Sequence, residues 1–589
     1  MRARPLLAAF VVAAVPGLSV AGGCSAGNDA GTGGGGLAPS SGNGDGGSTG
    51  NFTGSSGTGS DCITCSSDLH NVIDCDGNIL QACPPDQGCS PSGACVPACT
   101  AATENKSTIG CDFFSVTPAC IAEARGGCFA AMVANTWTSP VTVTAEFAGM
   151  TLNVANHLYI PQGQGAGLTY QLAPGGQLPA GELGILFLSS YESGDIYQVD
   201  CPAGVQPALL QNTQLDFTGL SNAFHIATTA PVVMYDVYPW GGAASYVSSA
   251  TLLLPTPTWG NNFVTADAWT ASAGQPFTQI VASEDNTMIT MVPTVNVTGG
   301  AGLPTMTANT SSTFTLNRGQ VAQFLQFERL AGSVLQSDKP VSVWGGASCM
   351  NIPDGQGACD AAHQQILPVQ TLGTEYLGAR YPPRQGAFDD QAPYMIVGMV
   401  DGTTLTYDPM PPGAPATLNQ GQVAVFFTDQ AFSVRSQDET HPFYVATYMT
   451  GGGTTSTGVG DPEYVNLVPP AQYLNSYLFA TDPTYGNTSL VFVRKKDGGG
   501  IFHDVSLDCM GTVTGWTPVG GGGLYEVARI KLTENFIGMN GCDNGKHTAT
   551  SPAPFGLTVW GYDSYASYGY PAGMAVDSIN TVVVPPVPQ

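Results

Sequence analysis

Short runs in which apolar and polar residues alternate make up most of the chain. Residues 280–292 hold two such runs around the turn residues Glu-Asp-Asn, and the second run alternates with a period of two. This pattern predicts a β-hairpin of half-buried strands. Similar runs rich in Val, Thr, Tyr and Phe recur among 76 glycines and 43 prolines. The sequence therefore predicts an all-β protein built from many short strands.

The strand pattern is internally repeated. Residues 315–325 and 417–427 are identical at eight of eleven positions, at an offset of 102. A proline-led apolar strand recurs at spacings of 109, 102 and 112, beginning at Pro231, Pro340, Pro442 and Pro554. Because proline has no N–H to donate, we expect these prolines at strand starts or sheet edges.

A second shared element follows the first three of these strands. It is an apolar residue and a proline, found at Leu254-Pro255, Leu367-Pro368 and Val468-Pro469. The duplication predicts four β-units, at 128–270, 271–385, 386–485 and 486–589. A unit of this length forms its own sandwich or supplies two blades of a propeller, since both architectures protect edge strands. We favour tandem sandwich-like units, with propeller-like closure as the alternative.

The first 60 residues differ from the rest. A basic start and an uncharged apolar run over residues 6–20 predict a signal peptide at 1–23, because 15 residues are too few to span a bilayer permanently. The run ends at Val-Ala-Gly-Gly-Cys24, which resembles a bacterial lipobox, although the lipobox usually has Leu, Val or Ile where this chain has Ala21. The resemblance implies acylation of Cys24. Residues 24–60 are Gly- and Ser-rich and predict a flexible tether. We therefore expect a lipid-anchored protein of a bacterial outer membrane or cell surface, or alternatively a secreted one.

Sixteen cysteines favour an oxidising compartment. Seven lie between Cys62 and Cys99, in a segment (61–127) with too few large apolar residues for a core, so we expect disulfides there rather than a zinc site. Further along, isolation in the sequence predicts two local disulfides, Cys349–Cys359 and Cys509–Cys542. Free buried thiols, or a bond from Cys349 back to Cys201, are the alternatives.

Charge and motif content narrow the function. The formal net charge is −27, which disfavours nucleic acid and anionic lipid as partners, so membrane contact is expected only through the lipid anchor. We find no nucleophile elbow, zinc-protease, P-loop or dinucleotide motif, and we predict no catalytic residues, no metal and no cofactor. Asp360 and His363 are the one suggestive local pair, and we interpret them as a structural loop pair.

One stretch resembles a known family. Residues 336–346, 349–353, 358–360 and 365–368 look like the N-terminal domain of the IgG Fc-binding protein family, and the resemblance extends over about 128–575. It implies an extracellular binding protein, but the Fc ligand does not transfer with the fold.

The C-terminal tyrosines are candidate ligand contacts. Tyr562, Tyr565, Tyr568 and Tyr570 lie within nine residues among small neighbours, a composition suited to protein or glycan recognition. Their packing within the last unit is the alternative.

We therefore expect a surface protein that binds an extracellular protein or glycan. A structural matrix or coat component is the alternative, and a polysaccharide-active enzyme is a third hypothesis.

Overall fold

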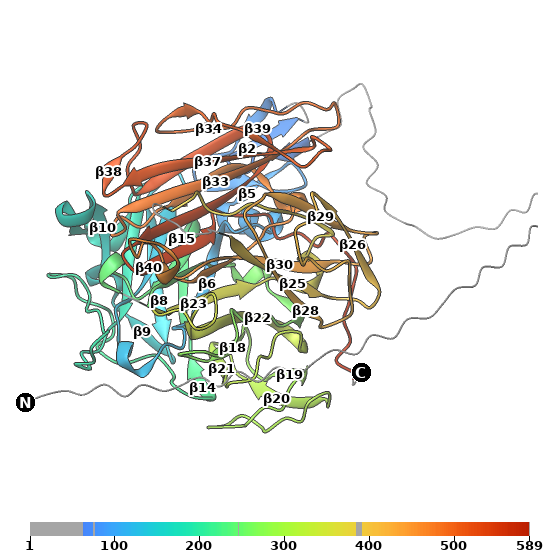
Figure 1. The fold of residues 1–589 in the computed structure, drawn as a ribbon. Coiled ribbons are helices and arrows are strands. Elements are labelled where there is room, and N and C mark those ends of the chain that lie inside the picture. Colours follow the sequence, from blue (N-terminus) through green and yellow to red (C-terminus); the bar gives the residue numbers. More distant parts are fainter. Residues whose placement is uncertain (1–62, 75–76, 246, 385–390, 588–589) are drawn as a thin grey trace, which may run out of the picture. The chain divides into compact units, whose positions relative to one another are not determined.

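The computed structural model describes residues 63–74, 77–245, 247–384 and 391–587 (Figure 1). Cys24, the predicted signal peptide and the predicted tether lie outside these residues. Residues 61–589 form one compact unit. The all-β prediction is confirmed, since strands dominate and the described part of the chain has one α-helix, α1 (Ala98–Asn105). No closed propeller is seen in the described residues. No described helix is long and apolar enough to cross a bilayer.

The N-terminal module is small and cross-linked. It contains β1 (Ile63–Cys65), β2 (Asn71–Asp74), β3 (Ile79–Ala82), β4 (Gln87–Cys89) and β5 (Cys95–Pro97). Its disulfides are Cys65–Cys89, Cys83–Cys95 and Cys99–Cys111. Each of these sulfurs is therefore bonded to another sulfur, as expected for a segment without a large core.

The first large sheet has the path β11-β10-β13-β7-β15-β8-β12, with β6 and β16 on β15 and β9 on β8. Its strands are β6 (Gly110–Ser115), β7 (Phe129–Asn135), β8 (Val141–Phe147), β9 (Met150–Leu152), β10 (Leu158–Gln162), β11 (Thr169–Leu172), β12 (Gln177–Leu178), β13 (Leu183–Ser189), β15 (Phe224–Tyr238) and β16 (Ser249–Leu252).

The second sheet has the path β14-β21-β18-β22-β19-β20, with β17 and β23 on β22. Its strands are β14 (Gly219–Asn222), β17 (Gly260–Val264), β18 (Pro276–Ala282), β19 (Thr287–Val292), β20 (Ser312–Leu316), β21 (Gln320–Leu325), β22 (Val334–Met350) and β23 (Asp360–Ile366). The two strands predicted at 280–292 are found as β18 and β19, but the predicted hairpin is wrong, because they do not pair with each other. Both pair antiparallel with the long strand β22, β18 over residues 341–347 and β19 over residues 334–337.

Two four-stranded sheets follow, with the orders β24-β29-β26-β27 and β28-β25-β30-β31. Their strands are β24 (Glu375–Gly378), β25 (Ala392–Gly398), β26 (Thr403–Asp408), β27 (Thr417–Leu418), β28 (Val423–Thr428), β29 (Phe432–Ser436), β30 (Phe443–Met449) and β31 (Glu463–Asn466). Side chains of both sheets, among them Tyr394, Phe426 and Phe432, share one core cluster, so this part is a sandwich.

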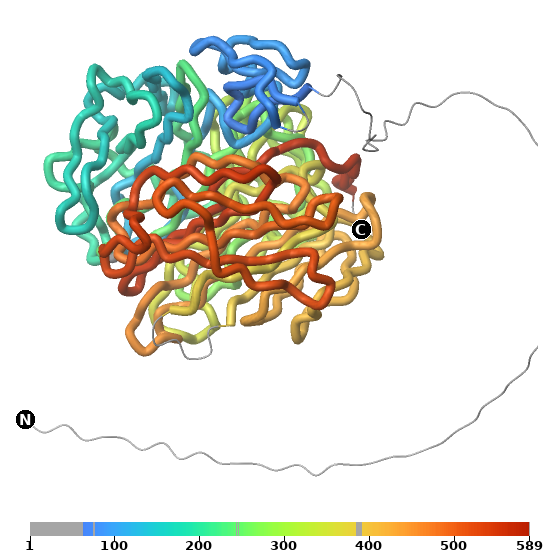
Figure 2. Tube along the Cα trace, turned by 90° about the horizontal axis from the view of Figure 1, so that it is seen from above, coloured from blue at the N-terminus to red at the C-terminus, as the bar shows by residue number. Residues whose placement is uncertain are grey.

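The last sheet has the path β35-β34-β39-β33-β37-β36, with β32 and β40 on β39 and β38 on β37. Its strands are β32 (Leu474–Ala480), β33 (Asn487–Lys495), β34 (Ser506–Leu507), β35 (Gly511–Thr512), β36 (Thr517–Val519), β37 (Tyr525–Glu534), β38 (Ile537–Gly538), β39 (Lys546–Asp563) and β40 (Ala566–Pro571). The segment after β40 then returns to the chain between α1 and β6, where the Thr108 N–H donates to Met574 O at 2.9 Å. Figure 2 shows the red C-terminal segment running close to the blue N-terminal module.

The repeated prolines differ from the prediction at three of four positions. Pro442 precedes β30, but Pro231, Pro340 and Pro554 lie inside the long strands β15, β22 and β39. Each of these strands changes its pairing partner at the proline: β15 pairs with β8 over residues 224–228 and with β7 over 232–237. The missing N–H therefore falls where one ladder ends and the next begins, and costs no hydrogen bond there.

Each repeated strand pairs antiparallel with the short strand that follows it: β15 with β16, β22 with β23, β30 with β31 and β39 with β40. We call the short strands β16, β23, β31 and β40 the inner strands. β16 contacts β23 and β40, and β31 contacts the same two strands, so the inner strands follow one another around a common centre. β22, β23, β39 and β40 are labelled in Figure 1.

Candidate ligand-binding cavity

Two features singled out in the sequence meet at one place. The disulfide Cys349–Cys359, with a Cα–Cα distance of 5.1 Å, closes the loop between β22 and β23. Tyr565 lies in the turn between β39 and β40. Both line a cavity of about 520 Å³.

The cavity lies at the beginnings of the inner strands. Its lining includes Val247, Cys359, Asp461 and Tyr565, which precede β16, β23, β31 and β40 by one or two residues. Residues from four repeats, each more than 100 positions from the next, therefore converge because the inner strands share a centre.

Most of the cavity wall is apolar. Ile121, Ala273 and the ring of Tyr197 contribute to it, and Tyr197 is 41% exposed. Asn351 also lines the cavity, but its amide is used to hold the disulfide loop, because Nδ2 donates to the carbonyls of Gln356 (2.8 Å) and Ala358 (2.7 Å). The rim is thus cross-linked covalently and by hydrogen bonds.

The four candidate tyrosines separate into two groups. Tyr565 is 39% exposed, while Tyr562, Tyr568 and Tyr570 are 4%, 0% and 0% exposed. Tyr570 donates its hydroxyl to Ala480 O, and Tyr568 accepts the N–H of Asp482. These three are therefore buried, Tyr568 and Tyr570 in β40, where every residue is buried, and Tyr562 in β39. Of the four candidates, Tyr565 keeps an exposed ring with which to contact a ligand.

The loop before β31 shapes the place of Tyr565. The N–H of Tyr565 donates to Gly458 O at 2.7 Å. A Cβ at Gly458 would collide with the Tyr565 ring, and Gly458 has a φ of +71°. Glycine at this position therefore lets the loop lie against the ring and leaves Tyr565 at the cavity.

Asp461 is the residue that sequence reasoning missed. Its side chain is 1% exposed; Oδ1 accepts the Gly452 N–H at 2.9 Å, and Oδ2 has no hydrogen-bond partner in the described structure. Burial raises the pKa of Asp461 to about 7, against the smaller lowering effects of the Gly452 N–H and the Arg384 charge. One signal was available: Asp461 precedes Pro469 by eight residues, as Asp360 precedes Pro368.

Two further carboxylates lie beside Asp461 in the protein interior. Asp360 and Glu463 are both 0% exposed, and Asp360 Oδ1 and Glu463 Oε2 lack partners in the described structure. Burial raises the pKa of Asp360 well above its usual range, and the charges of Asp461 and Glu463 raise it further. Burial likewise raises the pKa of Glu463, so the pKa values of all three carboxyl groups are raised by the same cause.

The pair Asp360 and His363 is not a loop pair. Both residues belong to β23, and residues three apart on a strand point to opposite faces. His363 Nε2 instead lies 2.7 Å from Asp236 Oδ1, and its Nδ1 lies 3.2 Å from Ser249 Oγ. All three side chains are 0% exposed, so this Ser-His-Asp network packs inside the core and joins β15, β16 and β23.

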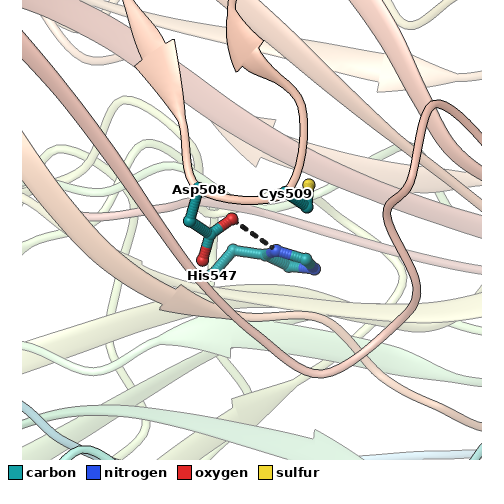
Figure 3. A group of neighbouring side chains, drawn as sticks. All are labelled: Asp508, Cys509 and His547. Atoms are coloured by element: carbon teal, nitrogen blue, oxygen red, sulfur yellow. Dashed lines mark hydrogen bonds and ion pairs between the residues drawn. The ribbon is translucent and has the colours of Figure 1, made fainter.

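One described group has the residue types of a metal site: Asp508, Cys509 and His547 (Figure 3). His547 Nδ1 is 3.0 Å from Asp508 Oδ1, and its Nε2 is 2.7 Å from Asp543 O. Cys509 is bonded to Cys542, with a Cα–Cα distance of 5.0 Å, so it has no thiolate to offer a metal. With both imidazole nitrogens also engaged, the group fits a structural role.

Cys201 and Cys120 are the cysteines relevant to two alternatives, a bond from Cys349 to Cys201 and cross-linking between chains. Cys201 is bonded to Cys128 and not to Cys349. Cys120 is a free thiol but is 3% exposed, and burial raises its pKa. Cross-linking of chains through Cys120 would require it to leave the core.

Comparison with known proteins gives one match. The family model described as IgGFc binding protein matches residues 249–561, from the first residue of β16 into β39. The matched segment contains the Cys349–Cys359 loop and Asp461. No curated protein and no solved structure matches the chain.

Proposed function

The chain belongs to the IgGFc binding protein family, and on that premise we propose that it binds an extracellular protein through the cavity at the inner strands. The family is one of binding domains and not of enzymes. The observation that best supports this proposal is that residues of four repeats line one preformed cavity of about 520 Å³. This size lies within the range of ligand sites, and a rim fixed by a disulfide loses little conformational entropy on binding.

We further propose that Cys24 carries a lipid and that the chain is displayed on a bacterial outer membrane or cell surface. The lipobox-like sequence and the Gly- and Ser-rich segment after it support this placement. A surface binding protein needs both a link to the membrane and reach beyond it.

An array of extracellular proteins and glycans, probed with the purified full chain, tests the proposed function. We expect binding to one or more proteins, weakened by Tyr565→Ala and unchanged by Tyr191→Ala. Tyr191 is a matched control, because it is 49% exposed and does not line the cavity. If both variants lose binding equally, or if neither loses binding, the ligand binds outside the cavity. If the chain binds glycans and no protein, the proposed protein partner is wrong.

A further inference from the structure

We propose that the cavity receives a primary alkylammonium group, as carried by a lysine side chain of the partner protein, with the ammonium on Asp461 Oδ2. This inference rests on the proposed function and specifies the chemistry of its ligand. Its starting point is the unpartnered oxygen. A carboxylate that is 1% exposed and lines a cavity lacks one hydrogen bond, and an N–H or O–H of a ligand satisfies it.

The acidic groups around this oxygen favour a cation over an anion. Asp360 and Glu463 lie beside Asp461, and each also has an oxygen without a partner in the described residues. The hydrogen bonds described for the nearby Arg384 go elsewhere: Nη1 donates to Thr450 O and Val459 O at 2.8 and 3.0 Å. An arriving ammonium therefore meets an oxygen of Asp461 that accepts no hydrogen bond from another described group. A net charge of −27 also steers basic partners toward the chain.

The geometry of Asp461 favours an ammonium over a guanidinium. Arginine binds carboxylates best through two parallel hydrogen bonds to both oxygens. Oδ1 of Asp461 already accepts the Gly452 N–H, whereas Oδ2 accepts none, so Oδ2 is the oxygen that a ligand would satisfy. A point-like ammonium fits this arrangement.

The cavity wall suits the rest of a lysine side chain. Ile121, Val247 and Ala273 offer apolar contact for the methylene stem. The half-exposed rings of Tyr197 and Tyr565 line the same cavity and can attract a cation through their faces. A bare divalent cation fits less well, because among the described residues the three-ligand group is Asp508, Cys509 and His547, and it does not include Asp461.

Titration calorimetry of the full chain at pH 8 tests the proposal. The probes are a doubly capped Ala-Ala-Lys-Ala-Ala peptide, its Nε-acetylated form and its Arg counterpart. We expect acetylation to weaken binding at least about tenfold, the effect of losing one charge-assisted hydrogen bond, and the Arg peptide to bind more weakly than the Lys peptide. We expect Asp461→Asn to cause the same loss as acetylation.

Asp482→Asn is the matched control, because Asp482 is also fully buried with an unpartnered oxygen but does not line the cavity. We expect it to leave peptide binding unchanged. Equal binding of the Lys and acetylated peptides to the unmodified chain would overturn the proposal even if Asp461→Asn failed to fold. Equal binding of the Arg peptide, or Asp461-dependent binding of CaCl₂ in place of the peptide, would also overturn it. If a protein partner found on the array loses affinity with Tyr565→Ala but not with Asp461→Asn, the proposed function stands and the ammonium fails. If it loses affinity with neither, both fail.

Discussion

Replacing Asp461 by Asn should make the stability of the protein less dependent on pH. Asparagine keeps the size of the side chain and the acceptor for the Gly452 N–H, but it cannot ionise. In the folded protein burial raises the pKa of Asp461 to about 7, whereas the ordinary pKa of an exposed Asp is 3.8. Between these two values the folded protein holds a proton that the unfolded chain has released, so the stability falls as the pH rises.

The size of the effect follows from the width of that window. Each pH unit inside it costs about 1.4 kcal/mol, so Asp461 alone removes about 2–3 kcal/mol from the free energy of unfolding between pH 5 and pH 8. Burial raises the pKa of Asp482 to about 6. The same reasoning gives a smaller loss over the same range, about 1–2 kcal/mol.

Urea unfolding followed by the fluorescence of the seven tryptophans, at pH 5, 6, 7 and 8 and constant ionic strength, measures these differences. We expect the unmodified chain to lose the most stability across the series, Asp482→Asn less, and Asp461→Asn the least. Curves for Asp461→Asn that run parallel to those of the unmodified chain would mean that Asp461 is already ionised at pH 5. That result would refute the description of Asp461 as a buried carboxyl group whose Oδ2 accepts no hydrogen bond.

Three further outcomes follow from burial, cross-linking and the leader sequence. Replacing Cys349 and Cys359 together by Ala should lower the free energy of unfolding by about 2.7 kcal/mol, because the disulfide removes the loop-closure entropy of this short loop from the unfolded chain. Peptide mapping of the unmodified chain without reduction should recover the two cysteines in one linked peptide. Tyr568→Ala should destabilise the protein by about 3–5 kcal/mol, because the Tyr568 ring is fully buried. Tyr565→Ala should destabilise it far less, because the Tyr565 ring is 39% exposed. Equal shifts of the urea midpoint in the two variants would contradict this difference in burial. Mass spectrometry of the mature N-terminus should find Cys24 acylated, and an unmodified start at the neighbouring residues would indicate a freely secreted protein.

Local sequence patterns determined the strand content and the repeat. Period-two alternation requires no knowledge of distant neighbours, because each strand has the same two faces wherever it lies. The loop from Cys349 to Cys359 was likewise predictable from proximity in the sequence. The repeated prolines marked equivalent strands but not their surroundings. Pro231 lies inside β15 because the pairing partner of that strand changes there, and the partner comes from elsewhere in the chain.

Tertiary structure decided which residues form the site. Val247, Cys359, Asp461 and Tyr565 lie far apart in the sequence and meet only because the inner strands of four repeats share a centre. The same arrangement covers both faces of β40, which buries Tyr568 and Tyr570, two of the tyrosines that composition had marked as candidate ligand contacts. Exposure and pKa depend on what packs across from a side chain, and that neighbour comes from another repeat. The sequence by itself therefore specified the strands and their duplication, while the closing of the repeats on one another created the cavity and placed an unpartnered carboxylate in its wall.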